Sequence, residues 1–331
     1  MKAVIVTGIG QDGYFLSKQL LEKGFKVIGV DQWQTKGYNP QLKELMSNEE
    51  FKLIEGDITD RYLIRRLLQE YKPVYFFNTA AISHVKVSFD IPTRVTDVNY
   101  LAVIQILEEI RTVSPETRFL QCSTSEQFGD NLDWPQDENS KMLPNSPYAM
   151  SKLGAYFIAK LFRRYGLKIY NSIAFNHESE IRPENFVTRK ITKGLSDIKK
   201  GLSDKLCLGN IDTFRDWGYA PDYTKAMIKI IESDAPDDYV LSTGERHSVR
   251  EFIEEACKCL NMNLEWKGKG LDEIGYIDGK PRIFISKEFY RPADVYNLCG
   301  NASKIKEKLG WEPKVKFKDL VKIMVGSDLN N

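Results

Sequence analysis

The glycine-rich turn after the first apolar run constrains the fold of this chain more than any other feature. Residues 2–7 are largely apolar, which is the pattern of a parallel strand buried on both faces. Gly8, Gly10 and Gly13 follow with the spacing G-x-G-x-x-G, and a helical apolar pattern begins directly after them. Such glycines permit a tight turn and let the backbone approach a pyrophosphate at the start of a helix. The residues that we expect to contact a dinucleotide there are Gly8, Gly10, Gln11, Asp12 and Gly13.

Strand and helix patterns alternate regularly through the first half of the chain. This alternation indicates an α/β fold with a Rossmann-like doubly wound parallel sheet. Residues 1–174 are expected to form this dinucleotide-binding domain, and residues 175–331 mainly a smaller mixed α/β lobe that binds the substrate. Later segments such as 206–241 would return to the first domain, so the two parts interleave. Further strands are expected at 26–30, 51–55, 74–77, 118–122 and 167–174, and helices at 60–71, 95–111 and 147–165.

The second half of the chain has a less regular pattern. The polar run at 176–184 is expected to be a loop. The stretch at 268–280 is rich in Gly, Lys and Asp, and we expect it to be mobile. Helices are expected at 186–200, 221–232, 249–260, 303–309 and 318–325, and short strands at 205–208 and 239–241.

Acidic and small residues at the ends of the next strands extend the predicted cofactor site. Asp31 ends the second strand, roughly 20 residues beyond the glycines, where a carboxylate accepts hydrogen bonds from the adenosine ribose and repels a 2′-phosphate. Asp57 and Ile58 follow the third strand, where an adenine edge would be recognised. Ala80 lies in a run of small residues after the fourth strand, which lets the backbone approach the cofactor. This pattern favours NAD, with NADP as the alternative.

Four residues after the fifth strand make a candidate catalytic set. Thr124 and Glu126 follow that strand, while Tyr148 and Lys152 stand four apart at the start of a helix and so share one face. A nearby ammonium, with the positive edge of a nicotinamide, lowers the pKa of a phenol, which then takes a proton from a substrate hydroxyl. Glu126 has no part in simple hydroxyl oxidation. It becomes useful where a new ketone acidifies a neighbouring C–H, because a carboxylate then removes that proton and protonates a departing hydroxyl.

Composition and charge restrict the partners. A net charge of +1 gives no general attraction to nucleic acid or to an anionic membrane. No apolar run approaches the roughly 18 residues of a membrane span, and the first apolar run is too short for a secretory signal. The five cysteines and three histidines show no metal-ligand spacing. We therefore expect a cytoplasmic protein with reduced thiols and no metal.

Ordered sequence blocks over nearly the whole chain resemble the GDP-mannose 4,6-dehydratase family of the extended short-chain dehydrogenase/reductase superfamily. They include G-Q-D-G at 10–13, S-T-S-E-Q-F-G at 123–129, S-P-Y-A-M-S-K at 146–152, F-N-H-E-S at 175–179 and R-D-W-G-Y-A-P-D-Y at 215–223. The resemblance implies Thr124, Glu126, Tyr148 and Lys152 as the catalytic set. It also implies nucleotide-sugar contacts at Ser83, Asn176, Val187, Lys190, Arg215 and Arg291.

The implied reaction converts GDP-mannose, or a close GDP-manno-sugar or heptose, to the GDP-4-keto-6-deoxy sugar. A 4-keto-sugar reductase or C4 epimerase on the same scaffold is an alternative, although neither needs the elimination that Glu126 suits. A non-catalytic nucleotide-binding sensor is a third hypothesis, and the complete catalytic set argues against it.

The sequence departs from the family pattern in two places that bear on cofactor and assembly. In the family, a basic pair after the second strand favours NADP. Here Asp31-Gln32-Trp33 stands in its place. The segment between residues 32 and 51 is shorter than usual, and in the family it helps to form a tetramer. We therefore expect a homodimer through the helices at 95–111 and 148–165, with a tetramer as the alternative.

Overall fold

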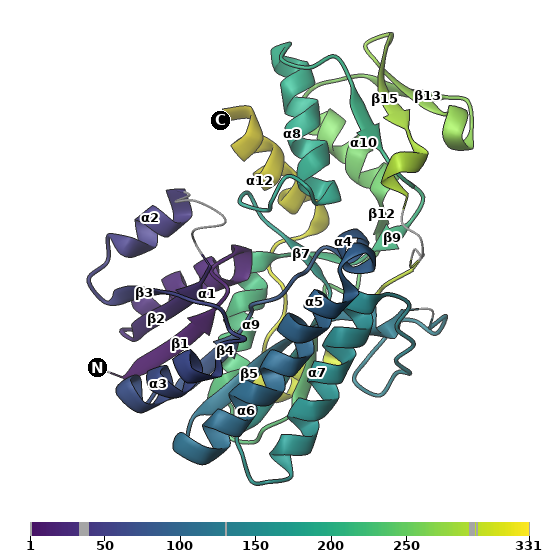
Figure 1. Ribbon diagram of the computed structural model, residues 1–331. Helices are drawn as coiled ribbons and strands as arrows, with labels where there is room; N and C mark the ends of the chain where they lie inside the picture. Colours follow the sequence, from purple (N-terminus) through teal and green to yellow (C-terminus); the bar gives the residue numbers. More distant parts are fainter. Residues whose placement is uncertain (1, 33–39, 130, 291–294, 296, 331) are drawn as a thin grey trace.

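The computed structural model describes residues 2–32, 40–129, 131–290, 295 and 297–330. Within them, seven parallel strands form one central sheet in the order β11-β6-β5-β4-β1-β2-β3. A smaller lobe, with the C-terminal helix at its side, stands beyond one end of the strands (Figure 1). The strands of the central sheet are β1 Ala3–Thr7, β2 Lys26–Asp31, β3 Phe51–Glu55, β4 Tyr75–Asn78, β5 Arg118–Thr124, β6 Ile169–Ala174 and β11 Asp238–Leu241.

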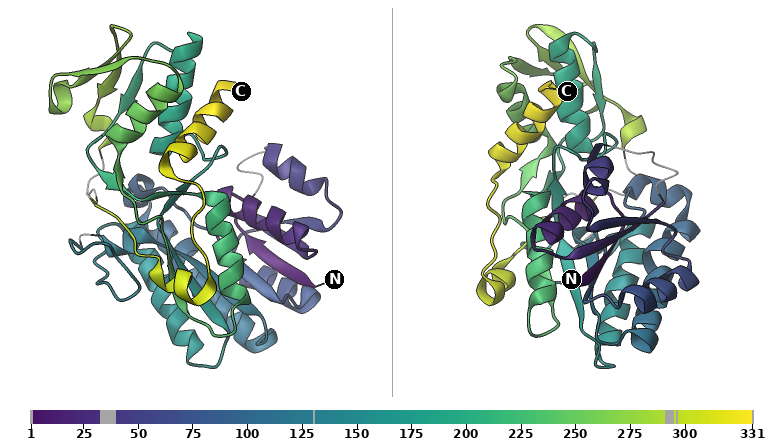
Figure 2. Two further views of the ribbon diagram at one scale, coloured as in Figure 1. Left: turned by 180° about the vertical axis from the view of Figure 1, so that it is seen from behind. Right: turned by 90° about the vertical axis from the view of Figure 1, so that its left-hand side faces the viewer.

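Helices cover both faces of the central sheet, which confirms the predicted Rossmann-like fold (Figure 2). The first strand shows why its sequence is apolar throughout, because Val4 and Val6 belong to the core on one face and Ile5 to the core on the other. One face carries α1 Gln11–Glu22, α9 Ala220–Glu232 and α11 Ser303–Leu309, with α2 Pro40–Met46 beside α1; the other carries α3 Arg61–Tyr71, α6 Ala102–Val113 and α7 Pro147–Arg163.

The segment expected as one helix at 95–111 is built from three pieces. It begins as α5 Pro92–Thr96, passes through a π-helical turn at Asp97–Leu101 and continues as α6. The π turn places the amide of Asn99 beside the loop that follows β4. That amide accepts from the Ile82 N–H at 2.9 Å and donates to the Ile82 carbonyl at 3.1 Å. Such π turns often occur at functional sites, and this one fixes the loop that carries Ser83.

The lobe contains a second sheet where the sequence suggested mobility. Among the described residues its strand order is β13-β14-β15-β8. The expectation of a mobile stretch at 268–280 is wrong, because Ile274–Ile277 and Lys280–Ile285 pair as an antiparallel hairpin. Ile277 and Ile283 are buried in the lobe core, which outweighs the polar composition of the surrounding residues. The other elements of the lobe are α8 Val187–Lys200, β8 Leu206–Leu208, α10 Val249–Cys259, β13 Leu264–Lys267 and α12 Phe317–Asn330.

Two short strand pairs join the lobe to the central sheet. The polar run expected as a loop begins with strand β7 Asn176–Glu178, which pairs in parallel with β10 Trp217–Tyr219. The run lacks a local strand signal, since its partner lies about 40 residues further along the chain. Strand β9 Phe214–Arg215 pairs with β12 His247–Ser248 in the same region. These strands bring the start of the lobe against the glycine-rich turn.

Candidate functional site

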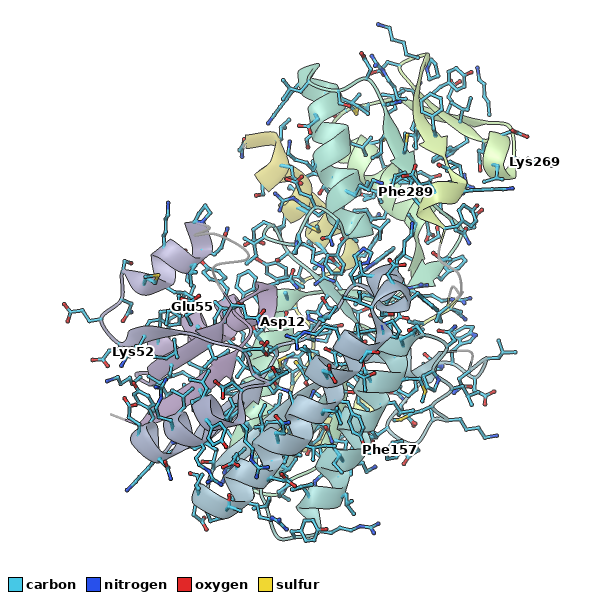
Figure 3. All side chains as sticks on the ribbon, viewed as in Figure 1. Asp12, Lys52, Glu55, Phe157, Lys269 and Phe289 are labelled. Carbon is cyan, nitrogen blue, oxygen red and sulfur yellow. The ribbon has the colours of Figure 1, made fainter. Side chains whose placement is uncertain are left out.

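A cavity of about 730 Å³ lies where the carboxyl ends of the central strands meet the lobe. In Figure 3, Asp12 lies at this junction, and Phe289 faces it from the lobe. Every predicted site residue within the described part of the chain lines the cavity, except Gly13. Arg291, predicted from the family resemblance, lies outside the described residues, as does Trp33.

Each glycine of the glycine-rich turn has a different structural role. Gly8 has a φ of +75°, and a Cβ there would lie 2.5 Å from the Ala80 Cα. A Cβ on Gly13 would lie 2.1 Å from the Gly8 carbonyl oxygen, so Gly13 serves packing inside the turn and does not face the cavity. Gly10 is the N-cap of α1, and a Cβ there would meet no described heavy atom within 4 Å. This open cradle at a helix N-terminus fits a pyrophosphate.

The far end of the cavity has the acidic residues expected for an adenosine site. Asp31 ends β2 and lines the cavity. Asp57 accepts hydrogen bonds from the Thr59 N–H at 2.9 Å and from Arg94 at 2.6 Å. Burial favours the neutral acid, but these bonds outweigh it and lower the pKa of Asp57. Arg94 comes from α5, and sequence reasoning missed it because no motif or spacing connects it to the cofactor residues.

The four predicted catalytic residues lie on one wall of the cavity. Thr124 ends β5 and Glu126 lies in the single 3₁₀ turn that follows it. Tyr148 and Lys152 lie on the first turns of α7, whose N-cap Ser146 accepts from the Ala149 N–H at 3.1 Å. Each of the four is less than a tenth exposed to solvent.

The charges around Tyr148 differ from the prediction that the ammonium of Lys152 lowers the pKa of its phenol. Burial raises the pKa of Tyr148 above its ordinary value, and a hydrogen bond with Thr124 lowers it in part. Lys152 donates to the Cys122 carbonyl, and burial lowers the pKa of this lysine. The carboxylate of Glu126 raises the pKa of Tyr148 further, and the guanidinium of Arg182 acts to lower it. Sequence reasoning missed Arg182, which follows β7 and pairs with Glu178 at 3.0 Å.

The predicted substrate residues line the part of the cavity next to the lobe. Lys190 lies 3.2 Å from the centre of the Phe289 ring, and burial lowers the pKa of its ammonium. Arg215 is almost fully buried and donates to the Val295 carbonyl at 2.6 Å, so part of its donor capacity serves the backbone. The remaining predicted residues on this wall are Ser83, Asn176 and Val187.

Among the described residues, no group of three or more His, Cys, Asp or Glu side chains could hold a metal ion. No helix in the same part of the chain is long and apolar enough to cross a membrane.

Comparison with known proteins decides the family. The family model for GDP-mannose 4,6 dehydratase matches residues 5–324. The chain belongs to the GDP-mannose 4,6-dehydratase family. It is 40% identical over 340 residues to GDP-mannose 4,6 dehydratase 2 of Caenorhabditis elegans, which covers 99% of this chain and 89% of the relative. It is also 40% identical over 350 residues to GDP-mannose 4,6-dehydratase of Vibrio cholerae, covering 99% and 94%.

Solved structures share the fold of this family member at lower sequence identity. The dTDP-glucose 4,6-dehydratase DesIV from Streptomyces venezuelae, with NAD bound, has a TM-score of 0.84 and 22% identity, covering 99% of this chain and 97% of that chain. The dTDP-glucose 4,6-dehydratase of Bacillus anthracis in complex with NAD has a TM-score of 0.83 and 21% identity, covering 100% and 97%. A Pseudomonas aeruginosa protein complexed with NADPH has a TM-score of 0.77 and 18% identity, covering 100% of both chains.

Proposed function

We propose that the protein is a nucleotide-sugar 4,6-dehydratase that converts GDP-mannose, or a close GDP-manno-sugar or heptose, to the GDP-4-keto-6-deoxy sugar. The observation that carries the proposal is the presence of Glu126 beside Thr124, Tyr148 and Lys152 on one wall of a cavity that also holds the glycine-rich turn. Relatives of about 40% identity over nearly the full length, named as GDP-mannose 4,6-dehydratases, support it.

The cofactor of this reaction is a nicotinamide dinucleotide, and we propose NAD. The open cradle at Gly10 supports a pyrophosphate there, and Asp31 supports an unphosphorylated ribose. A nicotinamide dinucleotide held there would supply the hydride acceptor for C4 of the sugar and the hydride donor for C6. Titration of the protein with each dinucleotide, followed by protein fluorescence, tests the choice. NADP bound much more tightly than NAD would overturn the role of Asp31.

Tyr148 serves the oxidation by taking the proton of the C4 hydroxyl. Burial raises the pKa of its phenol, and Thr124 and Arg182 oppose that rise only in part, so the positive edge of a bound nicotinamide would supply the remaining stabilisation of the phenolate. Thr124 shares the hydrogen bond to the same hydroxyl. Lys152 provides a buried ammonium one helical turn from the phenol. When hydride returns to C6, C5 must regain a proton, and the proton that Tyr148 took supplies it, which returns Tyr148 to its starting state.

Glu126 serves the elimination that follows. The C4 ketone acidifies the C5 hydrogen, and the carboxylate of Glu126 removes it as a general base. The same group then protonates the C6 hydroxyl, which departs as water. A reductase or a C4 epimerase does not eliminate water, so neither would use a buried acid at this position.

The GDP-sugar is held from the lobe side. Lys190 and Arg215 are cations suited to a diphosphate, and Ser83, Asn176 and Val187 complete the proposed contacts. Arg291 is proposed from the family resemblance alone.

A homodimer through α6 and α7 is proposed for the assembly. Met150, Phe157 and Leu161 on α7 are large apolar side chains that the single chain leaves exposed, and Phe157 lies at the outer edge of the sheet part in Figure 3. Light scattering on the purified protein tests the state, with a tetramer as the alternative. The five cysteines, all within the described residues, are free, which is consistent with the cytoplasmic location that we propose.

The decisive experiment uses GDP-mannose and its C5-deuterated form. We expect the product to lose one water relative to the substrate, no net NADH to accumulate, and deuterium to wash out from C5. Net stoichiometric NADH would contradict a dehydratase. Binding of the GDP-sugar with no chemical change would favour the sensor hypothesis.

A further inference from the structure

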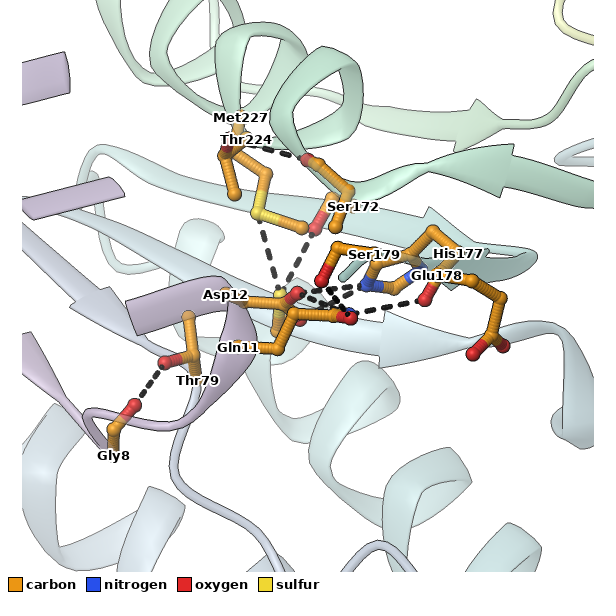
Figure 4. Close-up of polar contacts among 12 residues, drawn as sticks. Gly8, Gln11, Asp12, Thr79, Ser172, His177, Glu178, Ser179, Thr224 and Met227 are labelled. Atoms are coloured by element: carbon orange, nitrogen blue, oxygen red, sulfur yellow. Dashed lines mark hydrogen bonds and ion pairs between the residues drawn. The ribbon is translucent and has the colours of Figure 1, made fainter. Parts of the chain in front are cut away.

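A buried ion pair connects the glycine-rich turn to the lobe. His177, in the middle of β7, directs its Nε2 at both carboxylate oxygens of Asp12, each at 3.0 Å (Figure 4). Its Nδ1 lies 2.7 Å from the Phe175 carbonyl oxygen. Both ring nitrogens therefore face acceptors. An imidazole that donates from both nitrogens carries a positive charge.

Neighbouring contacts fix the position of this pair. The Gln11 side chain donates to the His177 carbonyl at 3.0 Å and accepts from the Ser179 hydroxyl at 2.7 Å. The ring of His177 stacks on Tyr223 of α9, with 4.9 Å between ring centres. Gln11 and Asp12, the two residues before the third glycine, thus hold His177 and Ser179 of the lobe.

The ion pair neutralises a negative charge that would otherwise oppose phosphate binding at the cofactor cradle. Asp12 lies in the first turn of α1, at the positive end of the helix where the pyrophosphate is expected. A free carboxylate there would repel the phosphates and would compete with them for the same helix end. His177 compensates that charge, and Asp12 and His177 both line the cavity with Gly10.

We propose that His177, as an imidazolium paired with Asp12, is a positioning residue for the dinucleotide that keeps the start of α1 able to accept a pyrophosphate. The proposal rests on the cofactor site of the proposed function and not on the dehydration chemistry. It assigns to the lobe a part in binding the cofactor, through a residue that does not touch it.

The charged groups around His177 set the direction of the pH dependence. Burial lowers the pKa of His177, but the charge and hydrogen bonds of Asp12 outweigh it, so the pKa lies above the ordinary value. Arg182, which is itself paired with Glu178, opposes this rise, and the phenol of Tyr223 stays neutral because burial raises its pKa. As pH rises through the pKa of His177, the imidazolium is lost and Asp12 is left uncompensated. Dinucleotide affinity should therefore fall toward alkaline pH.

Calorimetric titration with NAD, without any sugar substrate, tests the proposal. Bound phosphates stabilise the imidazolium of His177, so the Kd of the unaltered protein should increase about tenfold as the pH rises from below to above the pKa of His177. Below that pKa, His177→Gln should bind NAD about tenfold more weakly than the unaltered protein. Its Kd should not change as the pH rises. The double variant Asp12→Asn, His177→Gln removes both charges and should regain most of the lost affinity. His247→Gln is the matched control, since His247 stacks on Phe317 away from the cavity and its removal should leave the Kd and its pH profile unchanged.

The outcomes separate the proposal from a merely structural role. His177→Gln with unchanged NAD affinity, or a double variant that stays as weak as the single one, would overturn it. If His177→Gln fails to fold, Asp12→Asn alone decides, because it removes the charge that stabilises the imidazolium and should abolish the pH dependence of NAD binding. An Asp12→Asn protein that keeps the full pH dependence would overturn the proposal. Normal NAD binding with no turnover of GDP-mannose would refute the dehydratase function and leave the role of His177 standing.

Discussion

Replacing Gly8 by alanine should introduce both backbone strain and a steric clash at the glycine-rich turn. Gly8 has a φ of +75°, and an added Cβ would lie 2.5 Å from the Cα and 2.7 Å from the N of Ala80. The left-handed conformation costs an L-residue about 1–2 kcal/mol. Forcing a methyl group into a packed site adds about 1–3 kcal/mol. We therefore expect Gly8→Ala to lower the free energy of unfolding by about 2–5 kcal/mol.

Gly24 provides a matched control for this prediction. Its φ of +79° is nearly the same, but a Cβ there would meet no described heavy atom within 4 Å. Gly24→Ala should therefore show only the conformational cost of about 1–2 kcal/mol. Urea unfolding followed by circular dichroism, with equal m-values, gives the two free energies. Because both alanines restrict the unfolded chain equally, the difference between the variants isolates the contact with Ala80.

Equal losses in the two variants would refute the steric argument. A second check uses Ala80→Gly in the Gly8→Ala background. The closest atoms are backbone, and the Ala80 Cβ is farther away at 3.1 Å. Removing that Cβ should therefore restore little of the stability, and full rescue would show that the close approach is misjudged.

Three further predictions follow from the same structure. Gly10→Ala should change the free energy of unfolding by under about 0.5 kcal/mol. It should weaken NAD binding by roughly tenfold or more, because the added Cβ would enter the cradle. Calorimetry that finds unchanged NAD affinity would contradict this. Glu126→Gln should slow product formation by about 100-fold or more while NADH still forms in a single turnover, and a fully active variant would rule out the elimination role. Asp238→Asn should lower the free energy of unfolding at neutral pH by about 3 kcal/mol, since the Asp238 carboxylate accepts from Arg163 at 2.6 Å. Burial opposes ionisation of Asp238, but Arg163 holds its folded-state pKa below the ordinary value. This contribution is complete above a pH of about 3.9 and is lost as the pH falls through the folded pKa. A difference between the two proteins that stays constant down to acid pH would refute the pair.

Local sequence signals predicted the central sheet and the position of the cofactor turn. Val4, Ile5 and Val6 are apolar because a parallel strand between two helical layers is buried on both faces. The meeting of four predicted residues at one cavity was also foreseeable, since Tyr148 and Lys152 share a helix face and Thr124 and Glu126 follow one strand end. The roles of these four residues stay predictions until they are measured.

Only the tertiary structure decided which charges meet in the cavity. Asp12 and His177 are 165 residues apart, Arg94 reaches Asp57 from another helix, and Lys152 donates to the carbonyl of Cys122. Periodicity and glycine spacing act within a few residues, so the sequence by itself determines strands, helices and turns. Electrostatic partners depend on which surfaces pack together across the whole chain, and no local pattern records that choice. The sequence thus predicted a dinucleotide turn and a proton-transfer set, and the fold decided which charges surround them.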